Sequence, residues 1–345
     1  MPGTCLITGG AGFIGSNFAH QWIAEESDSL LINVDALTYA GHIGSLTDIE
    51  SHPRYRFVHA NIGDGEAMRN VLRTYRPCDV VNFAAETHVD RSIARPEDFV
   101  MTNVVGTFHL LEVVREYFTT LSEKEKKQFR FLHVSTDEVY GSLGSTGKFT
   151  EESPYAPNSP YAASKASSDH FVQAYYRTFG LPILRTNSTN NYGPYQFPEK
   201  LIPLMTINAI EGKPLPVYGD GMQIRDWLYV EDHCRAIRLV LRKGIIGETY
   251  NIGGNTEIPN IEIVRLICDF IEKYCPKIKH KPIRSLISHV QDRLGHDRRY
   301  AIDTTKIETT LGWKPLESFE SGLNKTLQWY LNHLDWVQSV RQKRS

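Results

Sequence analysis

The segment HVSTDEVYG (His133–Gly141) places two adjacent carboxylates, Asp137 and Glu138, directly after an apolar stretch. Burial at the end of a strand and repulsion between the two groups both raise carboxyl pKa values. One group can then carry a proton while its neighbour stays ionised, so the pair could supply an acid and a base to adjacent atoms of one substrate. The alternative is structural, because the same residues could cap the N-terminus of a helix.

A second pair that could do chemistry lies in YAASK, where Tyr161 and Lys165 are four residues apart. On a helix the two side chains share one face, so the ammonium group can lie near the phenol and near the ribose of a nicotinamide cofactor. A positive charge beside a tyrosine favours the phenolate, which is a usable base near neutral pH. This spacing is common on protein surfaces and gains meaning only from the other motifs.

A glycine loop, GGAGFIG, carries Gly9, Gly12 and Gly15 between an apolar run and a helical pattern. Such a loop lets the backbone approach a pyrophosphate at a helix N-terminus. Asp35 follows Gly15 by twenty residues, at the end of the next apolar run. A carboxylate there accepts hydrogen bonds from a ribose 2′-OH and repels a 2′-phosphate. The sequence therefore predicts NAD rather than NADP, and a tight turn without a ligand is the alternative.

The elements that must position these residues alternate between short apolar runs and helical patterns. This alternation predicts βαβ units and a parallel sheet whose strands are covered on both faces. We expect strands near 4–10, 29–35, 55–62, 79–85, 129–136, 181–188 and 248–254, and helices near 13–26, 100–118, 161–179, 261–274 and 319–334.

The expected fold is α/β, a Rossmann-type doubly wound parallel sheet with a smaller, mostly C-terminal α/β substrate lobe. After Asn190 the chain becomes richer in proline and glycine, which marks the change of lobe. We expect an NAD-binding domain over 1–190, with a return near 227–258, and a substrate-binding domain over 191–226 and 259–345.

The amino-acid composition argues against several classes of function: nucleic-acid binding, metal binding through cysteines, and membrane insertion. The net charge is −2, with 41% hydrophobic and 23% charged residues, so there is no basic field that would suggest a nucleic-acid partner. The five cysteines form no CxxC pattern, which predicts reduced thiols and no metal site. We find no signal region and no apolar run long enough to span a membrane, so we expect a cytoplasmic protein without a membrane partner.

Taken together, these motifs resemble those of the extended short-chain dehydrogenase/reductase family, and within it the nucleoside-diphosphoglucose 4,6-dehydratases. The resemblance covers nearly the whole chain. The segments that carry it are TGGAGFIGS, NVDALTYAG, FAAETHVDRSI, STDEVYG, YAASKA, NNYGPYQFPEKLIP, IRDWLYVEDH, YNIGG and DRLGHDRRYAID.

The resemblance implies a reaction in three steps with catalytic residues Thr136, Asp137, Glu138, Tyr161 and Lys165. Tyr161, aided by Thr136, takes the proton of the sugar 4-OH while hydride passes from C4 to NAD. Glu138 then removes the C5 proton and Asp137 protonates the departing C6 hydroxyl, before the hydride returns to C6. Because net redox is zero, the resemblance implies that NAD stays tightly bound and is regenerated in each cycle.

The resemblance also implies a set of cofactor-binding residues. They are Gly9, Gly12, Phe13, Ile14, Gly15, Asp35, Ala36, Leu37, Thr38, Asn61, Ile62, Phe83, Ala84, Ala85, Thr87, Thr102, Tyr161, Lys165 and Asn191.

The implied substrate is dTDP-glucose, whose two phosphates need cations nearby. The implied substrate-binding residues are His88, Thr136, Asn190, Lys200, Leu201, Pro216, Val217, Tyr218, Arg225, Asn260, Arg293 and His296. Leu294, Met222 and Gln291 depart from the family pattern near the nucleotide pocket, so another NDP-glucose such as UDP-glucose stays open as the substrate.

Two further readings remain. An NDP-sugar 4-epimerase or decarboxylase would share the glycine loop, Tyr161 and Lys165, but it would not need the acid–base pair after Thr136. A non-enzymatic NAD-binding scaffold would not need to keep the catalytic set.

The resemblance implies a homodimer in which the helices near 100–118 and 161–179 pair with a second subunit in a four-helix interface. Their apolar residues, which could instead simply pack on the sheet, include Val104, Leu110, Leu111, Val114, Phe171, Val172 and Tyr175.

Overall fold

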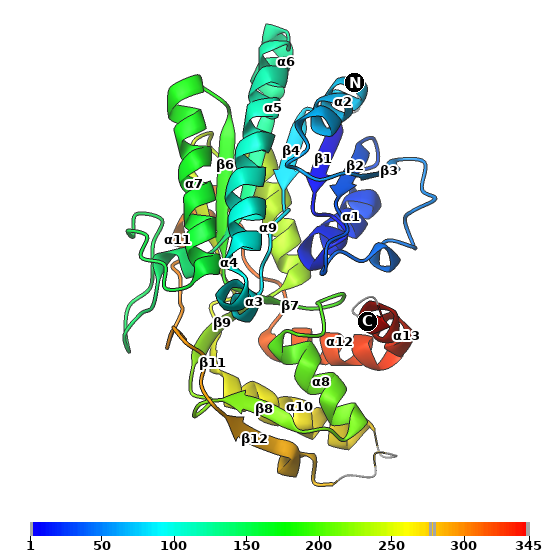
Figure 1. The fold of residues 1–345 in the computed structure, drawn as a ribbon, viewed down its shortest axis with the longest axis vertical. Coiled ribbons are helices and arrows are strands. Elements are labelled where there is room, and N and C mark those ends of the chain that lie inside the picture. Colours follow the sequence, from blue (N-terminus) through cyan, green and yellow to red (C-terminus); the bar gives the residue numbers. More distant parts are fainter. Residues whose placement is uncertain (1–2, 276–277, 279–280, 343–345) are drawn as a thin grey trace.

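The computed structural model describes residues 3–275, 278 and 281–342, and its centre is a seven-stranded sheet in the order β10-β6-β5-β4-β1-β2-β3 (Figure 1). Every neighbouring pair in this sheet is parallel. The strands are β1 (Thr4–Thr8), β2 (Leu30–Asp35), β3 (Tyr55–His59), β4 (Asp79–Asn82), β5 (Arg130–Thr136), β6 (Ile183–Ser188) and β10 (Thr249–Ile252). The strand order reverses beside β1, where open parallel sheets bind ligands beyond the carboxyl ends of their strands.

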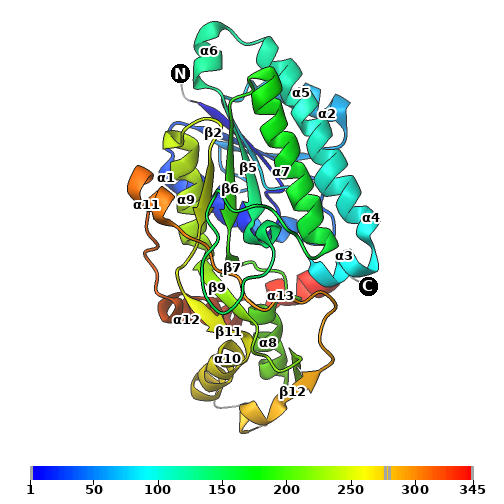
Figure 2. The same cartoon turned by 90° about the vertical axis from the view of Figure 1, so that its left-hand side faces the viewer.

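Helices cover both faces of this sheet, as the continuous apolar runs predict. One face carries α1 (Phe13–Glu25), α9 (Val230–Lys243) and α11 (Thr305–Leu311). The other carries α2 (Gly65–Tyr75), α5 (Thr107–Thr119) and α7 (Pro160–Phe179), and Figure 2 shows α5 and α7 side by side. The hydrophobic side chains of β1, β2 and β5 are almost all buried between these layers, which explains their runs of apolar residues.

The predicted helix near 100–118 is not one regular helix. It consists of a π-helical turn, η2 (Val100–Gly106), followed by α5, and it is preceded by the short helices α3 (Val89–Ala94) and α4 (Pro96–Phe99). The side chain of Asn103 in this turn accepts a hydrogen bond from the Glu86 N–H (2.8 Å) and donates to the Glu86 carbonyl (3.0 Å) and to Ser164 Oγ (2.8 Å). The π-helical turn therefore ties the loop after β4 to α7.

The smaller lobe lies below the sheet in Figure 1. It contains a three-stranded sheet in the order β11-β9-β7 and a parallel pair, β8 and β12. Its strands and helices are β7 (Asn190–Tyr192), β8 (Leu215–Tyr218), β9 (Ile224–Tyr229), β11 (Glu257–Pro259), β12 (Ile287–Val290), α8 (Leu201–Glu211), α10 (Asn260–Tyr274), α12 (Phe319–Asn332) and α13 (Leu334–Gln342). The remaining elements are η1 (Ile43–Ser45), α6 (Glu123–Gln128), η3 (Asp137–Tyr140) and η4 (Ile283–Leu286).

The chain passes between the lobes several times. After β9 it returns to the large sheet as α9 and β10, and after β12 it returns again as α11, which packs on α9 and β10. At the C-terminal end, Trp336 of α13 donates a hydrogen bond from Nε1 to Ser45 Oγ (3.2 Å) beside the large sheet. The expected division into two domains stays a prediction. Within 259–345, α11 and α13 both contact the larger lobe.

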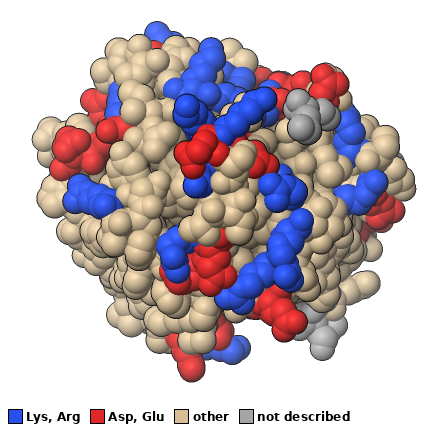
Figure 3. Space-filling model, turned by 90° about the horizontal axis from the view of Figure 1, so that it is seen from above, with Lys and Arg blue, Asp and Glu red and all other residues tan. Residues whose placement is uncertain are grey.

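The surface at the upper end of the molecule carries basic and acidic side chains interspersed (Figure 3). Ion pairs such as Arg69–Glu116 and Arg76–Glu125, each 2.7 Å, join α2 to α5 and α6. Within the described residues, no helix combines the length and apolar character that a membrane span needs.

Candidate active site

The glycine loop between β1 and α1 brings the backbone close to neighbouring segments. Gly9 has φ +71°, and a Cβ there would lie 2.7 Å from the backbone of Ala84. A Cβ on Gly15 would lie 2.4 Å from the Gly9 carbonyl oxygen, so the first turn of α1 packs directly on the loop. α1 begins at Phe13 without a side-chain cap, and its first turn contains no acidic residue. These features leave a helix N-terminus suited to an anionic group.

Asp35 at the end of β2 faces the same loop. Its Oδ2 accepts a hydrogen bond from the Ala11 N–H (2.8 Å) and its Oδ1 accepts one from the Leu37 N–H (2.7 Å). The carboxylate is therefore fixed at the end of the strand, and it also lines the adjacent cavity. Leu37 does not line that cavity, and its backbone (φ 50°) instead helps to hold Asp35.

A cavity of about 270 Å³ lies beyond the carboxyl ends of the strands. Apart from Leu37, every residue predicted to bind the cofactor lines it, namely Gly9, Gly12, Phe13, Ile14, Gly15, Asp35, Ala36, Thr38, Asn61, Ile62, Phe83, Ala84, Ala85, Thr87, Thr102, Tyr161, Lys165 and Asn191. Thr189 Oγ1 and Asn191 Oδ1 are buried there without a hydrogen-bond partner among the described residues. The glycine cradle, Asp35 and these unpartnered oxygens fit a dinucleotide with a free ribose 2′-OH.

The five predicted catalytic residues line this cavity from three elements. Thr136 ends β5, and Asp137 and Glu138 begin the short helix η3, whose first turn is capped by Thr136 Oγ1 accepting from the Glu138 N–H (3.3 Å). Tyr161 and Lys165 lie on α7, which begins after Ser159, whose Oγ accepts a hydrogen bond from the Ala162 N–H (3.1 Å). Asp137 and Glu138 thus lie in the first turn of a short helix, but Thr136, not either carboxylate, supplies the capping side chain.

Asp137 and Glu138 have different electrostatic surroundings. Burial raises the pKa of Asp137 well above its usual value, and the charges of Glu138 and Asp226 raise it further. Asp137 Oδ2 is buried without a hydrogen-bond partner among the described residues. Burial also raises the pKa of Glu138, but the cations Lys200, Arg225 and Arg293 lower it. The proton of the pair therefore resides preferentially on Asp137.

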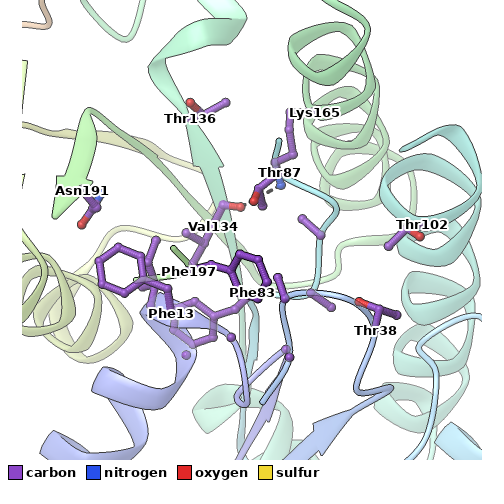
Figure 4. A pocket seen from close by; sticks show the side chains of 18 of the residues that line it. Phe13, Thr38, Phe83, Thr87, Thr102, Val134, Thr136, Lys165, Asn191 and Phe197 are labelled. Carbon is purple, nitrogen blue, oxygen red and sulfur yellow. Dashed lines mark hydrogen bonds between the residues drawn. The ribbon is translucent and has the colours of Figure 1, made fainter. Parts of the chain in front are cut away.

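Lys165 is not among the groups with the largest effect on the pKa of Tyr161. Its ammonium donates a hydrogen bond to the Val134 carbonyl (2.9 Å) and lies 3.3 Å from His133 Nε2, and Figure 4 shows it reaching from α7 towards β5. Burial lowers the pKa of Lys165 to about 8. Burial and the nearby Glu138 raise the pKa of Tyr161 well above its usual value, against a hydrogen bond with Thr136 that lowers it.

A second cavity, of about 380 Å³, lies between the two lobes. Eleven of the twelve residues predicted to bind substrate line it: His88, Asn190, Lys200, Leu201, Pro216, Val217, Tyr218, Arg225, Asn260, Arg293 and His296. Thr136 lines only the first cavity. Glu138, Asn190 and Lys200 line both, so the two cavities meet beside the acid–base pair.

The basic side chains of the second cavity are each held in place. Arg225 lies over the Tyr300 ring at 4.3 Å and donates to the Asp297 carbonyl (2.9 Å). Lys200 donates to the Thr87 carbonyl (2.9 Å). Arg293 donates from its Nη2 to Asp90 Oδ2 (2.9 Å), which joins the loop of the smaller lobe to α3 of the larger lobe.

Sequence reasoning missed several residues of both cavities. Tyr39 and Phe197 line the first, Asp90 and Tyr300 line the second, and Glu199 lines both. Each stands inside a motif that carried the resemblance, so position within those motifs was the available signal. Nothing in the sequence showed that Asp90 lies beside Arg293, because the two residues are 203 positions apart.

These features define a class of protein. A doubly wound parallel sheet, a glycine loop with Asp35, a Tyr161–Lys165 pair and a second cavity between two lobes are characteristic of extended short-chain dehydrogenase/reductases. Comparison with known proteins narrows the class. The sequence model of the GDP-mannose 4,6 dehydratase family matches residues 6–326. The dTDP-glucose 4,6-dehydratase of Xanthomonas campestris pv. campestris (strain B100) is 56% identical over 337 residues, which are 98% of this chain and 95% of the relative.

Other relatives and solved structures are similar to this chain over nearly its whole length. The dTDP-glucose 4,6-dehydratase of Salmonella typhimurium is 54% identical over 97% of this chain and 95% of its own length. The structure of that enzyme from Streptomyces venezuelae, with NAD and TDP bound, has a TM-score of 0.89 at 45% identity and covers 98% of this chain and 99% of its own. A UDP-glucose 4-epimerase from Thermotoga maritima has a TM-score of 0.83 at 29% identity, covering 96% and 99%.

The chain belongs to the dTDP-glucose 4,6-dehydratase family. The predicted fold class and the predicted activity, an NAD-dependent hydro-lyase, are thereby confirmed, and the epimerase reading is disfavoured by its lower identity.

Proposed function

We propose that this chain converts dTDP-glucose into dTDP-4-keto-6-deoxyglucose and water, with NAD in the first cavity and the nucleotide sugar in the second. The observation that carries this proposal is the position of Glu138, which lines both cavities next to Asp137. An acid–base pair at such a junction can act on a sugar carbon next to the one that faces the nicotinamide.

The first step is assigned to α7 and the end of β5. Bound NAD supplies the hydride acceptor at C4 and later the hydride donor at C6. Tyr161 removes the proton of the 4-OH, and the hydrogen bond with Thr136 offsets part of the rise that burial and Glu138 cause in the pKa of the phenol. Lys165 contributes a positive charge near the cofactor ribose.

The elimination step uses the unequal surroundings of the two carboxyl groups. Glu138, whose charge is supported by Lys200, Arg225 and Arg293, takes the proton from C5 and returns it to C5 when hydride adds to C6. Asp137, in which burial favours the neutral acid, gives its proton to the departing C6 hydroxyl, which leaves as water. Both side chains lie on the same turn of η3, so they can act on neighbouring carbons.

The diphosphate is assigned to the cations of the second cavity, above all Arg225 and Arg293, and the base to the pocket near Asn260. Asn260 Oδ1 is buried without a hydrogen-bond partner among the described residues, so it can accept a hydrogen bond from a bound base. The choice of thymidine over uridine rests on the relatives. The division into an NAD-binding and a nucleotide-sugar-binding domain, at the expected boundaries, belongs to this proposal.

We also assign the protein to the cytoplasm and to a homodimer. All five cysteines are free, which suits a reducing compartment. Of the apolar residues expected at a dimer interface, Leu110, Leu111, Val114, Val172 and Tyr175 are buried. Phe171, however, is 40% exposed, and Phe108, Met101 and Phe179 add apolar surface on the same side of the molecule. This exposed face supports a four-helix interface built from α5 and α7.

The test is a product assay on the purified protein without added NAD. dTDP-, UDP- and GDP-glucose are offered separately, and products are followed by mass spectrometry and by the alkaline absorbance of 4-keto-6-deoxy sugars. We expect loss of one water from dTDP-glucose. Water loss from UDP-glucose alone would identify UDP-glucose as the substrate instead. A product of unchanged mass would point to an epimerase. Loss of carbon dioxide from UDP-glucuronate, run as a control, would point to a decarboxylase.

A further inference from the structure

A buried carboxylate lies behind Lys165, outside both cavities. Asp169 lies one helical turn after Lys165 on α7 and is fully buried. Its Oδ2 accepts hydrogen bonds from Ser135 Oγ (2.8 Å) and from the Tyr155 hydroxyl (2.9 Å). Its Oδ1 has no hydrogen-bond partner among the described residues. The proposed mechanism gives this costly buried charge no role.

The unpartnered oxygen of Asp169 and the Lys165 ammonium both lie close to one ring nitrogen of His133. Asp169 Oδ1 lies 3.4 Å from His133 Nε2, the same nitrogen that lies 3.3 Å from Lys165 Nζ. All three side chains are buried, so their charges interact with little screening.

His133 cannot balance the charge of Lys165 itself. Thr8 Oγ1 donates to Asn82 Oδ1 (2.6 Å), so the Asn82 amide nitrogen is the atom that faces His133 Nδ1 (3.0 Å). Asn82 donates this hydrogen bond, and the hydrogen of the neutral imidazole is therefore on Nε2. Burial, Lys165 and Arg185 lower the pKa of His133, so the ring is neutral. His133 then offers Lys165 neither a negative charge nor a lone pair.

The remaining charged and titratable groups around Asp169 come from three elements and one loop. Arg185 of β6 donates to the Asp169 carbonyl (3.3 Å), and Tyr140 and Tyr155 face the carboxylate as neutral phenols. On its cavity side, Lys165 shares the wall with Tyr161 and the acid–base pair. Asp169 is the anion that favours the charged form of Lys165, whose pKa burial lowers to about 8.

We propose that Asp169 is a positioning residue of this enzyme: its carboxylate keeps Lys165 in the ammonium form and, through Ser135, fixes the end of β5 from which Thr136 projects. This inference rests on the proposed role of Lys165 and goes beyond it, because it assigns the maintenance of that charge to a residue that touches neither cavity.

The direction of the effect follows from linkage. Lys165 is charged below its pKa and loses its charge as the pH rises through about 8. Asp169→Asn removes the group that raises this pKa, so the loss of charge moves to lower pH. The alkaline limb of activity, and the pH at which NAD affinity declines, should both move down by about one pH unit.

The experiment compares the full-length protein with Asp169→Asn and with Tyr155→Phe from about pH 6 to about pH 10. Tyr155→Phe is the matched control, because it removes one hydrogen bond to the same carboxylate oxygen and keeps its charge. Two quantities are measured at each pH: the rate of 4-keto-6-deoxy product formation, and the affinity of NAD for protein stripped of cofactor, followed by tryptophan fluorescence. We expect both midpoints to move in Asp169→Asn and neither to move in Tyr155→Phe.

Asp169→Asn leaves the buried Lys165 and the half-buried Arg185 as cations without their anion, and the variant can fail to fold for that reason. The double variant Asp169→Asn/Arg185→Met removes one cation with the anion and is expected to show the same shift. Unchanged midpoints in a folded variant, or a rate reduced by the same factor at every pH, would overturn the proposal. A wild-type protein that forms no 4-keto product from dTDP-glucose would instead refute the proposed function.

Discussion

At the scale of single residues, the proposed reaction depends on two adjacent carboxyl groups that differ in how readily they lose a proton. Three cations and one carboxylate act on the pKa of Glu138, whereas two carboxylates and one cation act on that of Asp137. A base and an acid can therefore coexist on consecutive residues at one pH. This is the physical reason for placing two carboxylates where stability alone would place none.

Replacing Glu138 by Gln should separate oxidation from elimination. The amide cannot take the C5 proton, but Tyr161 and Lys165 are unchanged, so C4 oxidation should still occur. We expect product formation to fall by about 10²- to 10⁴-fold while reduced cofactor still forms, as seen in its absorbance during a single turnover. Tyr161→Phe should form no reduced cofactor, and the exposed Glu152→Gln serves as the control. Full product from Glu138→Gln would remove this residue from the mechanism.

Asp226 gives a stability test that is independent of turnover. Burial raises the pKa of Asp226 to about 6, above its value in the unfolded chain. The folded state therefore binds this proton more tightly than the unfolded state, and this contribution to stability is lost as the pH rises through about 6. Between about pH 5 and about pH 7 this one group should cost about 1 kcal/mol of unfolding free energy. Asp226→Asn should remove that part of the decline, measured by urea unfolding at both pH values. An identical pH dependence in both proteins would contradict the assignment.

At the scale of elements, the ion pair between Arg293 and Asp90 connects α3 with the loop after β12 across the second cavity. A bound diphosphate must compete with Asp90 for this guanidinium group. Asp90→Asn should therefore tighten TDP binding roughly fivefold, as measured by calorimetry, since a partly exposed pair contributes up to about 1 kcal/mol. The control is Asp98→Asn, which removes an exposed pair with Arg95 on α4. Weaker binding in Asp90→Asn would show that the carboxylate orients Arg293 for the ligand instead.

The same scale shows what the sequence could predict. The periodicity of apolar residues predicted the parallel sheet. Gly9, Asp35, Glu138 and Tyr161 follow predicted strands or lie on a predicted helix, so the sequence also indicated that they meet at one edge of the sheet. The orientation of the Lys165 side chain could not be predicted from the sequence, because its ammonium donates a hydrogen bond to the Val134 carbonyl in β5. The π-helical turn at 100–106 was also missed, because its residue types do not distinguish i→i+5 hydrogen bonding from that of an α-helix.

At the scale of the whole molecule, the exposed aromatic side chains of α5 and α7 predict self-association. Phe108 and Phe171 pack against each other at 6.1 Å between ring centroids while both remain partly exposed. Phe171→Glu would bury a charge in the proposed interface and should convert the dimer into a monomer in light scattering. Leu316→Glu is the control, because Leu316 is 77% exposed on another part of the surface. A monomeric wild-type protein over a wide concentration range would reject the interface.

The path of the chain between the lobes has a consequence for engineering. Because α9, β10 and α11 complete the larger lobe after the chain has already entered the smaller one, neither lobe is a contiguous piece of sequence. A chimaera that takes its nucleotide-recognising half from a relative therefore needs several splice junctions, and a single crossover point would leave both halves short of elements they require. Base preference in this scaffold is more readily transplanted side chain by side chain than by exchange of modules.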